Sequence, residues 1–335
     1  MKKILVTGGT GYIGSHTVVK LLEAGYEVVI LDNLLNSKAS VIDRIEKITN
    51  QRPLFIEGDI RDKSLLEKLF SDHTIDAVIH FAGLKAVGES VEEALKYYDN
   101  NVGGSISLLE AMKNANVTKM VFSSSATVYG EPQELPIKED HPLNPTNPYS
   151  KTKLAVENLL RDLYRSSPKW KIFILRYFNP VGAHQSGLIG EDPSGIPNNL
   201  FPYIAKVAMG ELESLKVFGD DYDTKDGTGV RDYIHVNDLA DAHLRALEKL
   251  SQAKCEAINL GTGKGYSVLE IINAFQSESK RTINLIISGR RKGDISTCYA
   301  NVSSAKKILN WLAQYDICDM CKDSWFWQIK NIEKK

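Results

Sequence analysis

The first half of the chain alternates short apolar runs with segments in which apolar residues recur every three or four positions. A short apolar run is typical of a buried strand, whereas the longer recurrence is typical of a helix that packs by one face. Six runs have the strand pattern, at 3–7, 27–31, 54–59, 76–83, 119–125 and 171–177. Because these strands are apolar on both faces and alternate with helices, the pattern predicts an α/β fold with a doubly wound parallel sheet.

Two of the predicted helices are long and flank the fifth strand, at about 92–115 and 149–165. At the start of the second, Tyr149 and Lys153 are four residues apart, so they share one face of the helix. An ammonium beside a phenol favours the phenolate, and lowering a tyrosine pKa by about three units takes roughly 4 kcal/mol. This spacing is also common on ordinary helices, so the proton chemistry that it suggests needs support from other residues.

A glycine turn follows the first strand. Gly8, Gly11 and Gly14 lead into a helical pattern, and the next strand ends at Asp32. Glycines at these places let the backbone turn tightly and approach a pyrophosphate, which the N–H groups of the helix start can bind. A carboxylate at the position of Asp32 binds the adenosine ribose hydroxyls and repels a 2′-phosphate, so the pattern predicts NAD rather than NADP.

Other polar or small residues end the later strands. Asp59 follows the third strand and is placed to accept from an adenine amino group, Ala82 and Gly83 end the fourth, and Ser125 ends the fifth. Ligands of parallel sheets bind beyond the carboxyl ends of the strands. We therefore expect these residues to line one crevice with the glycine turn.

The composition changes after Phe178. Glycine and proline become frequent through 182–202, and polar residues occur in separate short segments. This favours an α/β organisation in two parts. Residues 1–178, with a later return of the chain near 231–261, are the expected NAD-binding Rossmann domain. Residues 179–335 are mainly a smaller mixed α/β domain for substrate, in which Arg231 and Arg291 on separate loops suit a diphosphate.

Composition adds mainly exclusions. The 335 residues carry a formal net charge of −1 with acids and bases interspersed, which predicts neither a nucleic-acid partner nor a charged membrane anchor. No apolar run approaches the length of a membrane span or a signal peptide. The four cysteines are sparse, so we expect a cytoplasmic protein without disulfides. Cys318 and Cys321 have metal-ligand spacing, but no second pair or histidine cluster accompanies them, and no metal site is predicted.

Five segments, at 6–14, 81–90, 122–130, 176–184 and 227–236, together resemble the extended short-chain dehydrogenase/reductase family over nearly the whole chain. The resemblance implies an NAD-dependent isomerase that inverts C4 of a UDP-hexose through a transient 4-keto sugar, interconverting UDP-glucose and UDP-galactose. It also implies a homodimer that pairs through the two long helices.

The same resemblance assigns roles to individual residues. Tyr149 is the catalytic acid/base, Lys153 holds the nicotinamide ribose and lowers the tyrosine pKa, and Ser125 hydrogen-bonds the reacting sugar oxygen. The implied cofactor site consists of Gly8, Gly11, Tyr12, Ile13, Gly14, Asp32, Asn33, Asn36, Ser37, Asp59, Ile60, Phe81, Ala82, Gly83, Lys85, Asn100, Tyr149, Lys153 and Phe178. The implied substrate site consists of Lys85, Ser125, Thr127, Tyr149, Asn179, Asn199, Leu200, Lys216, Val217, Phe218, Arg231, Arg291, Asp294 and Cys298.

Cys298 bears on the choice of sugar. Family members with tyrosine at this position are restricted to plain hexoses, whereas those with a small residue also accept UDP-N-acetylglucosamine and UDP-N-acetylgalactosamine. We therefore expect both substrate classes. The alternative is that Cys298 is simply a small buried residue, and this is compatible with the same open pocket.

Two alternatives remain open. A nucleotide-sugar 4,6-dehydratase begins with the same oxidation, but it needs an acid pair after the fifth strand, where this chain has Ala126 and Thr127. If the chain were a non-catalytic NAD-sensing or scaffolding protein, we would expect one of the Ser, Tyr and Lys residues to be missing. Ser125, Tyr149 and Lys153 are all present.

Overall fold

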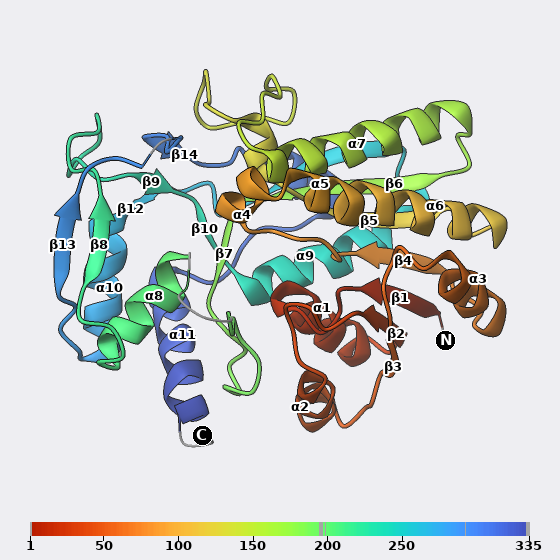
Figure 1. Cartoon of the computed structure of the whole chain (residues 1–335), viewed down its shortest axis with the longest axis horizontal. Helices are drawn as coiled ribbons and strands as arrows, with labels where there is room; N and C mark the ends of the chain where they lie inside the picture. The colour runs from red at the N-terminus through yellow and green to blue at the C-terminus, as the bar shows by residue number, and fades with distance from the viewer. Residues whose placement is uncertain (1, 194–196, 198, 292, 333–335) are drawn as a thin grey trace.

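Seven parallel strands form the central sheet of the computed structural model, which describes residues 2–193, 197, 199–291 and 293–332 (Figure 1). Across the sheet the order is β11 (Cys255–Leu260), β6 (Lys171–Tyr177), β5 (Lys119–Ser125), β4 (Ala77–His80), β1 (Lys3–Thr7), β2 (Glu27–Asp32) and β3 (Leu54–Glu57). All six strand pairs are parallel. The predicted doubly wound fold is therefore confirmed.

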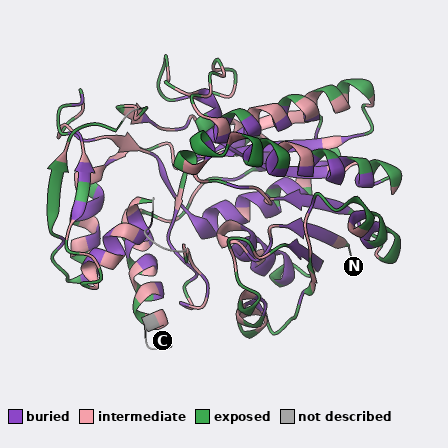
Figure 2. Cartoon of the chain, viewed as in Figure 1, coloured by how far each residue is buried: buried purple, intermediate pink, exposed green. Residues whose placement is uncertain are grey.

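Each face of the sheet is buried by a helical layer. Along β1, Ile4 and Val6 point to one cluster of apolar side chains and Leu5 to the other, as the two-residue period of a strand requires. The first cluster is completed by α1 (Tyr12–Glu23), α2 (Ser40–Thr49) and α9 (Val236–Lys249), and the second by α3 (Lys63–Asp72), α6 (Gly104–Asn114) and α7 (Pro148–Ser166). Figure 2 shows the strands buried between helices whose outer faces are exposed.

Helix α7 begins where the local sequence dictates. The side chain of Asn147 accepts a hydrogen bond from the Ser150 N–H at 3.0 Å, and Pro148 occupies the first turn, where no backbone donor is needed. The helix continues for 19 residues and buries Tyr149, Lys153 and Val156. The side chains predicted to carry chemistry therefore face the sheet.

The helix predicted at 92–115 is wrong as a single element. The chain instead forms α4 (Val87–Glu92), α5 (Ala94–Tyr97), a π-helical turn (Tyr98–Gly103) and then α6. The buried Asn101 side chain lies in the π-helical turn and bonds to both backbone groups of Leu84 and to the Thr152 hydroxyl. The α-helix is interrupted at this residue. The neighbouring Gly103 and Gly104 have poor helix propensity, which favours the interruption there.

Two strands are shorter than predicted, since β3 ends at Glu57 and β4 covers Ala77–His80. Their predicted last residues therefore lie in the loops that follow the strands. The returning chain supplies β11, the edge strand that pairs with β6 from Cys255 to Leu260.

The rest of the chain packs around a smaller apolar core, beside the carboxyl ends of the central strands. It contains α8 (Leu200–Ala208), α10 (Val268–Ser279), α11 (Ile317–Ile332) and the parallel pair β8 (Leu215–Phe218) and β13 (Leu285–Ser288). Its small sheets join β9 (Val230–Arg231) to β12 (Tyr266–Ser267) and β14 (Thr297–Cys298), and β7 (Asn179–Val181) to β10 (Tyr233–His235).

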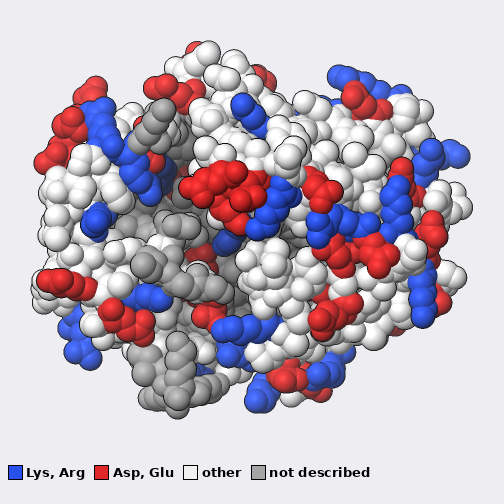
Figure 3. Space-filling view, in the orientation of Figure 1, with Lys and Arg blue, Asp and Glu red and all other residues white. Residues whose placement is uncertain are grey.

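In the part of the chain that the structure describes, no helix is long and apolar enough to cross a membrane. On the face seen in Figure 3, acidic and basic side chains are interspersed.

Candidate active site

The glycine turn between β1 and α1 is closely packed against the end of β4. Gly8 has a φ of +71°, and a Cβ there would lie 2.7 Å from the Ala82 backbone nitrogen. A Cβ on Gly14 would collide with the Gly8 carbonyl oxygen. Only glycine fits these two positions, and the turn delivers the first-turn N–H groups of α1, from Tyr12 onward, to the sheet edge.

Asp32 lies at the carboxyl end of β2, beside this turn. Its carboxylate accepts from the backbone N–H groups of Thr10 at 3.1 Å and Leu34 at 3.0 Å, and from the Ser37 hydroxyl at 3.1 Å. The carboxylate is held at the end of the strand next to the glycine turn. The donors and the carboxylate together fit a dinucleotide whose pyrophosphate lies on the helix start.

The Asp59 carboxylate, predicted to accept from an adenine amino group, already has hydrogen-bond partners within the chain. It is bound in a bidentate ion pair by Arg61, at 2.9 and 2.8 Å, and it accepts from Asn33 at 3.0 Å. The hydrogen bonds from Arg61 hold the pKa of Asp59 well below its usual range. This carboxylate remains an acceptor at the edge of the crevice. Of the other predicted cofactor residues here, Asn36 is exposed and Ile60 is buried against Gly104.

The loop after β4 brings small groups close to the predicted reaction centre. A Cβ added to Gly83 would lie 3.2 Å from the Asn101 side-chain oxygen and 3.9 Å from the Lys153 ammonium. Asn100, also predicted at the cofactor site, is buried and donates to Asn101 at 2.9 Å. The structure therefore brings the loop containing Phe81, Ala82 and Gly83 next to α7.

Ser125, Tyr149 and Lys153 come together at the carboxyl end of β5. Each is about 6% exposed. The Lys153 ammonium donates to the Ser123 carbonyl oxygen at 2.8 Å, and the Ser125 hydroxyl lies near the Tyr149 phenol. The Thr127 hydroxyl donates to the Ser125 oxygen at 3.0 Å. A phenol, a hydroxyl and an ammonium therefore converge in a site shielded from bulk water.

The electrostatics of this centre depend on burial. Burial raises the pKa of Tyr149, the neighbouring Tyr177 raises it further, and the Ser125 hydroxyl opposes both. Burial lowers the pKa of Lys153 to about 8, although Glu157 opposes this, so the group is an ammonium at neutral pH. The expected lowering of the tyrosine pKa by Lys153 remains a prediction, since in the chain alone burial is the largest influence and raises the pKa of Tyr149.

Several of the predicted substrate residues lie on the small sheets outside the central sheet. Arg291 makes a bidentate ion pair with Asp294, at 2.9 and 3.3 Å, and lies 4.7 Å above the Phe218 ring. Phe218 ends β8 with Lys216 and Val217 before it. On the next small sheet, Arg231 pairs in register with Cys298. Several predicted contacts therefore share one side of the molecule.

Cys298 is 9% exposed and belongs to the same buried apolar cluster as Ala126 and Phe178. Ala126 directly follows Ser125 in the chain. The small side chain is therefore part of the packing next to the reaction centre. Burial raises the pKa of its thiol to about 11, so Cys298 is uncharged at neutral pH.

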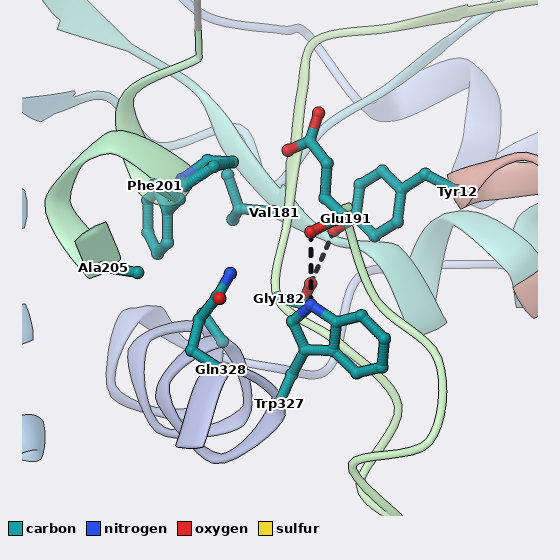
Figure 4. Close-up of a pocket in the computed structure, with 10 residues that line it drawn as sticks. Tyr12, Val181, Gly182, Glu191, Phe201, Ala205, Trp327 and Gln328 are labelled. Atoms are coloured by element: carbon teal, nitrogen blue, oxygen red, sulfur yellow. Dashed lines mark hydrogen bonds between the residues drawn. The ribbon is translucent and has the colours of Figure 1, made fainter. Parts of the chain in front are cut away.

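A carboxylate that the sequence did not indicate joins two of the predicted substrate residues. Glu191 accepts from the Asn199 amide at 2.7 Å and pairs with the Lys85 ammonium at 3.1 Å. Its backbone oxygen accepts from Trp327 Nε1 at 3.2 Å, as Figure 4 shows. Glu191 lies in a segment rich in glycine and proline, where no periodicity points to a contact. Leu200, the first residue of α8, is half-buried, and Asn179, the first residue of β7, is exposed.

Tyr177 is the second residue that the sequence reasoning missed. Its β6 position pairs in register with Ser125, and it raises the pKa of Tyr149. The signal was available, because Tyr177 ends a predicted strand beside the strand that ends at Ser125. Among the described residues, no group of three or more His, Cys, Asp and Glu side chains could hold a metal ion.

Comparison with known proteins agrees with this arrangement. Residues 4–261 match the model of the NAD dependent epimerase/dehydratase family. A UDP-glucose 4-epimerase of Bacillus subtilis is 57% identical over 330 residues, covering 98% of this chain and 97% of that protein. Crystal structures of UDP-glucose 4-epimerases match over 100% of both chains. The one from Stenotrophomonas maltophila, with NAD and formylated UDP-arabinopyranose, has a TM-score of 0.98 at 51% identity. The one from Bifidobacterium longum, with NAD⁺ and UDP, has a TM-score of 0.96 at 52% identity.

The fold, the glycine turn and these matches define a nucleotide-dependent α/β enzyme, and the chain belongs to the NAD-dependent epimerase/dehydratase family. Within that family it belongs with the UDP-glucose 4-epimerases of the extended short-chain dehydrogenase/reductase group. The prediction of NAD as cofactor is confirmed at the level of the family.

Proposed function

We propose that the protein interconverts UDP-glucose and UDP-galactose by transient oxidation at C4. The observation that carries the proposal is the buried meeting of Ser125, Tyr149 and Lys153 at the sheet edge that also holds the glycine turn. Such a centre suits proton transfer at a sugar hydroxyl, and NAD bound beside it would supply the acceptor and donor of the C4 hydride.

The residues of this chain divide the proton work. Tyr149 as phenolate takes the proton of the 4-hydroxyl and returns it to the same oxygen. Lys153, as an ammonium close by, stabilises the phenolate and holds the nicotinamide ribose. Ser125 donates to the reacting sugar oxygen and orients it. Since the intermediate is a planar 4-keto sugar, either face can be reduced once the ring has turned.

The anchoring of UDP is the second part of the proposal. Arg231, Arg291 and Lys85 offer cationic donors of the kind that bind phosphate oxygens, with Asn179 and Asn199 as neutral partners. Few of these contacts would reach the hexose, so the ring can turn while the diphosphate stays bound. We also propose the two-part division of the chain, with 1–178 and the return at 231–261 binding NAD and the remainder of 179–335 mainly binding UDP-sugar.

The direct test is incubation of the purified protein with UDP-glucose, followed by separation of the products. We expect UDP-galactose. A 4-keto-6-deoxy sugar would instead identify a dehydratase, and unchanged UDP-glucose would favour a non-catalytic NAD-binding protein.

The substrate range follows from Cys298. Cys298 packs in one cluster with Ala126 and Phe178. Because its side chain is small, we infer that the sugar pocket has room for a 2-acetamido group in both orientations of the ring. The protein should therefore also interconvert UDP-N-acetylglucosamine and UDP-N-acetylgalactosamine. Wild-type protein with no activity on UDP-N-acetylglucosamine would contradict this extension alone.

The assembly state is a further part of the proposal. Exposed apolar side chains gather on the segmented helix beside α7, with Leu95 87% exposed; they are Val87, Val91, Leu95, Tyr98 and Ile106. Covering such a patch stabilises an interface. We propose a homodimer through this face and α7, and a cytoplasmic location, because all four cysteines are free. Light scattering at micromolar concentration should give the dimer mass, and a monomer would contradict the interface.

A further inference from the structure

Three consecutive serines at the end of β5 each contact one residue on a single face of α7. The Ser123 carbonyl oxygen accepts from Lys153 at 2.8 Å, the Ser124 hydroxyl donates to Glu157 at 2.6 Å, and the Ser125 hydroxyl lies near the Tyr149 phenol. Residues 149, 153 and 157 are spaced by one helical turn, so they form a row along α7. Two of the three α7 residues belong to the proposed reaction centre, but the third, Glu157, has no assigned role.

Glu157 is fully buried and completely satisfied. Besides Ser124, it accepts from Arg176 Nε at 3.0 Å, from Arg176 Nη2 at 2.7 Å and from Arg161 Nη2 at 2.7 Å. Arg176 is 1% exposed and lies on β6, in register with Ser124. One carboxylate therefore fixes α7 to two adjacent strands at once.

These contacts leave α7 little freedom to slide or rotate on the sheet. Four donors occupy the carboxylate, and any displacement would leave a charged group buried without its partners, which is costly in a protein interior. The residues held in place by this attachment are Lys153, one turn away, and Tyr149, two turns away. The short distance means that a small shift at Glu157 is transmitted directly to the phenol.

We propose that Glu157 is a positioning residue for the reaction, which sets the register of α7 on β5 so that Tyr149 lies at Ser125 and Lys153 at Ser123. The inference rests on the proposed 4-epimerase activity and deepens it. It predicts that loosening the Glu157 contacts lowers turnover more than substrate binding, because a catalytic group displaced by about 1 Å can cost about 10²-fold in rate.

The charges around this row also favour an effect on the proton chemistry. Two ionisable groups interact with each other along α7, Lys153 and Glu157. The other ionisable groups that face them are His80 on β4, Tyr129 after β5, Arg161 on α7, Arg176 on β6 and Cys255 on β11. Burial lowers the pKa of His80 to about 3, so His80 is neutral. Glu157 raises the pKa of Lys153 against the effect of burial. Removing the Glu157 charge should therefore move the loss of the Lys153 proton to lower pH.

The test compares three variants of the full-length protein. Ser124→Ala removes the β5 contact and keeps the buried Glu157–Arg176 pair, and Glu157→Gln removes the charge. Tyr129→Phe is the matched control, because the Tyr129 hydroxyl accepts from the same Arg176 at 2.9 Å without touching α7 through any described hydrogen bond. The measurements are Tm, kcat, KM and the dependence of kcat on pH.

We expect Ser124→Ala to lower kcat by roughly tenfold, the worth of one hydrogen bond to a charged group, with KM changed far less. Glu157→Gln should lower kcat further and shift the alkaline limb of its pH profile to lower pH. Tyr129→Phe should lower Tm while leaving kcat and the pH profile near wild type.

The inference is overturned if Ser124→Ala matches the Tyr129→Phe control in kcat and pH profile, or if its effect is confined to KM. Should Glu157→Gln fail to fold, Ser124→Ala decides alone. Wild-type protein without 4-epimerase activity would defeat the proposed function and this inference with it. If the wild type is active and Ser124→Ala is equally active, the inference about Glu157 is contradicted and the proposed 4-epimerase activity stands.

Discussion

The proposed reaction centre and the proposed substrate-anchoring residues are built in opposite ways. Ser125, Tyr149 and Lys153 are each about 6% exposed, and Lys153 is bonded to the Ser123 carbonyl oxygen of the sheet. On the anchoring side, the Lys85 side chain is 61% exposed and that of Arg291 is 54% exposed, and each is paired with a single carboxylate. The proposed catalytic groups are fixed in the chain by itself, whereas each exposed cationic group is held by one ion pair, and such pairs contribute little when a partner is exposed to water.

This difference suits the chemistry of an epimerase. Proton transfer benefits from groups that are oriented in advance, since no reorganisation is then needed in the transition state. An anchor for a diphosphate can be assembled from exposed cations that exchange one anion for another. The contrast predicts that substitutions in the two regions affect different kinetic constants.

The largest effect is expected at the phenol. Tyr149→Phe removes the group that exchanges the proton and should lower kcat by about 10² or more, with substrate binding retained. The measurement is turnover of UDP-glucose under saturating substrate. Tyr97→Phe is the matched control, because Tyr97 is buried in the same cluster and bonds elsewhere, to Glu89 and Ala86. Near-normal turnover by Tyr149→Phe would remove Tyr149 from the mechanism.

The anchoring wall should show the opposite pattern. Arg231→Gln removes one charged donor from the proposed diphosphate site and should raise KM by roughly 10- to 100-fold, the worth of a hydrogen bond to a charged group, with kcat changed much less. Arg245→Gln on the outer face of α9, where Arg245 pairs with Asp241 and Glu248, should leave both constants unchanged. A fall in kcat alone for Arg231→Gln would break the contrast between the regions.

Cys298 connects the two regions, because it is a proposed substrate contact and it belongs to the same buried cluster as Ala126, which follows Ser125. Overpacking a formed pocket costs about 1 to 3 kcal/mol, so Cys298→Tyr should depress the reaction of UDP-N-acetylglucosamine by roughly ten- to a hundred-fold. The reaction of UDP-glucose should change far less, and Cys298→Ser, which keeps the small volume, should leave the ratio of the two activities near wild type. Equal slowing of both substrates by Cys298→Tyr would show that another residue sets the range.

The smallest expected effect concerns stability, and it reflects the buried neutral groups of the sheet region. Burial lowers the pKa of His16 and His80 to about 3 and that of His243 to about 4. Because the unfolded histidines titrate near pH 6.5, the unfolded chain binds more protons below that pH. The stability that these groups contribute is therefore full above about pH 7 and declines as pH falls, by up to about 1.4 kcal/mol per histidine and pH unit.

Urea unfolding between pH 7.5 and 5 measures this decline. His243→Leu should reduce the slope by about one histidine's share, since the Nδ1 of His243 bonds only to the Leu239 carbonyl and the ring is otherwise apolar in its contacts among the described residues. A free energy of unfolding that does not change over this range would contradict the assignment of neutral buried histidines.

The sequence predicted best what depends on local pattern. The strands follow from apolar runs, the glycine turn from Gly8, Gly11 and Gly14, and α7 from Asn147 and Pro148 at its start. The meeting of Tyr149 and Lys153 on one face needed only the helical period. These features were predictable because each is determined by residues close together in the chain.

The remainder depends on contacts between distant segments. The interruption of the helix near Asn101 arises with bonds to Leu84 and Thr152, and the ion pair of Glu191 with Lys85 joins residues 106 positions apart. Glu157 looked like an ordinary polar residue on a helix, because its partners Ser124 and Arg176 come from other strands. No periodicity reveals such partners.

The central claim is that one hydrogen leaves C4 of the sugar and returns to C4 on the other face. The most direct measurement uses UDP-glucose that carries deuterium at C4, with mass and NMR analysis of the UDP-galactose formed in ordinary water. The proposed mechanism predicts that the deuterium is retained at C4 of the product. Deuterium lost to solvent, or found at another carbon of the sugar, would contradict it.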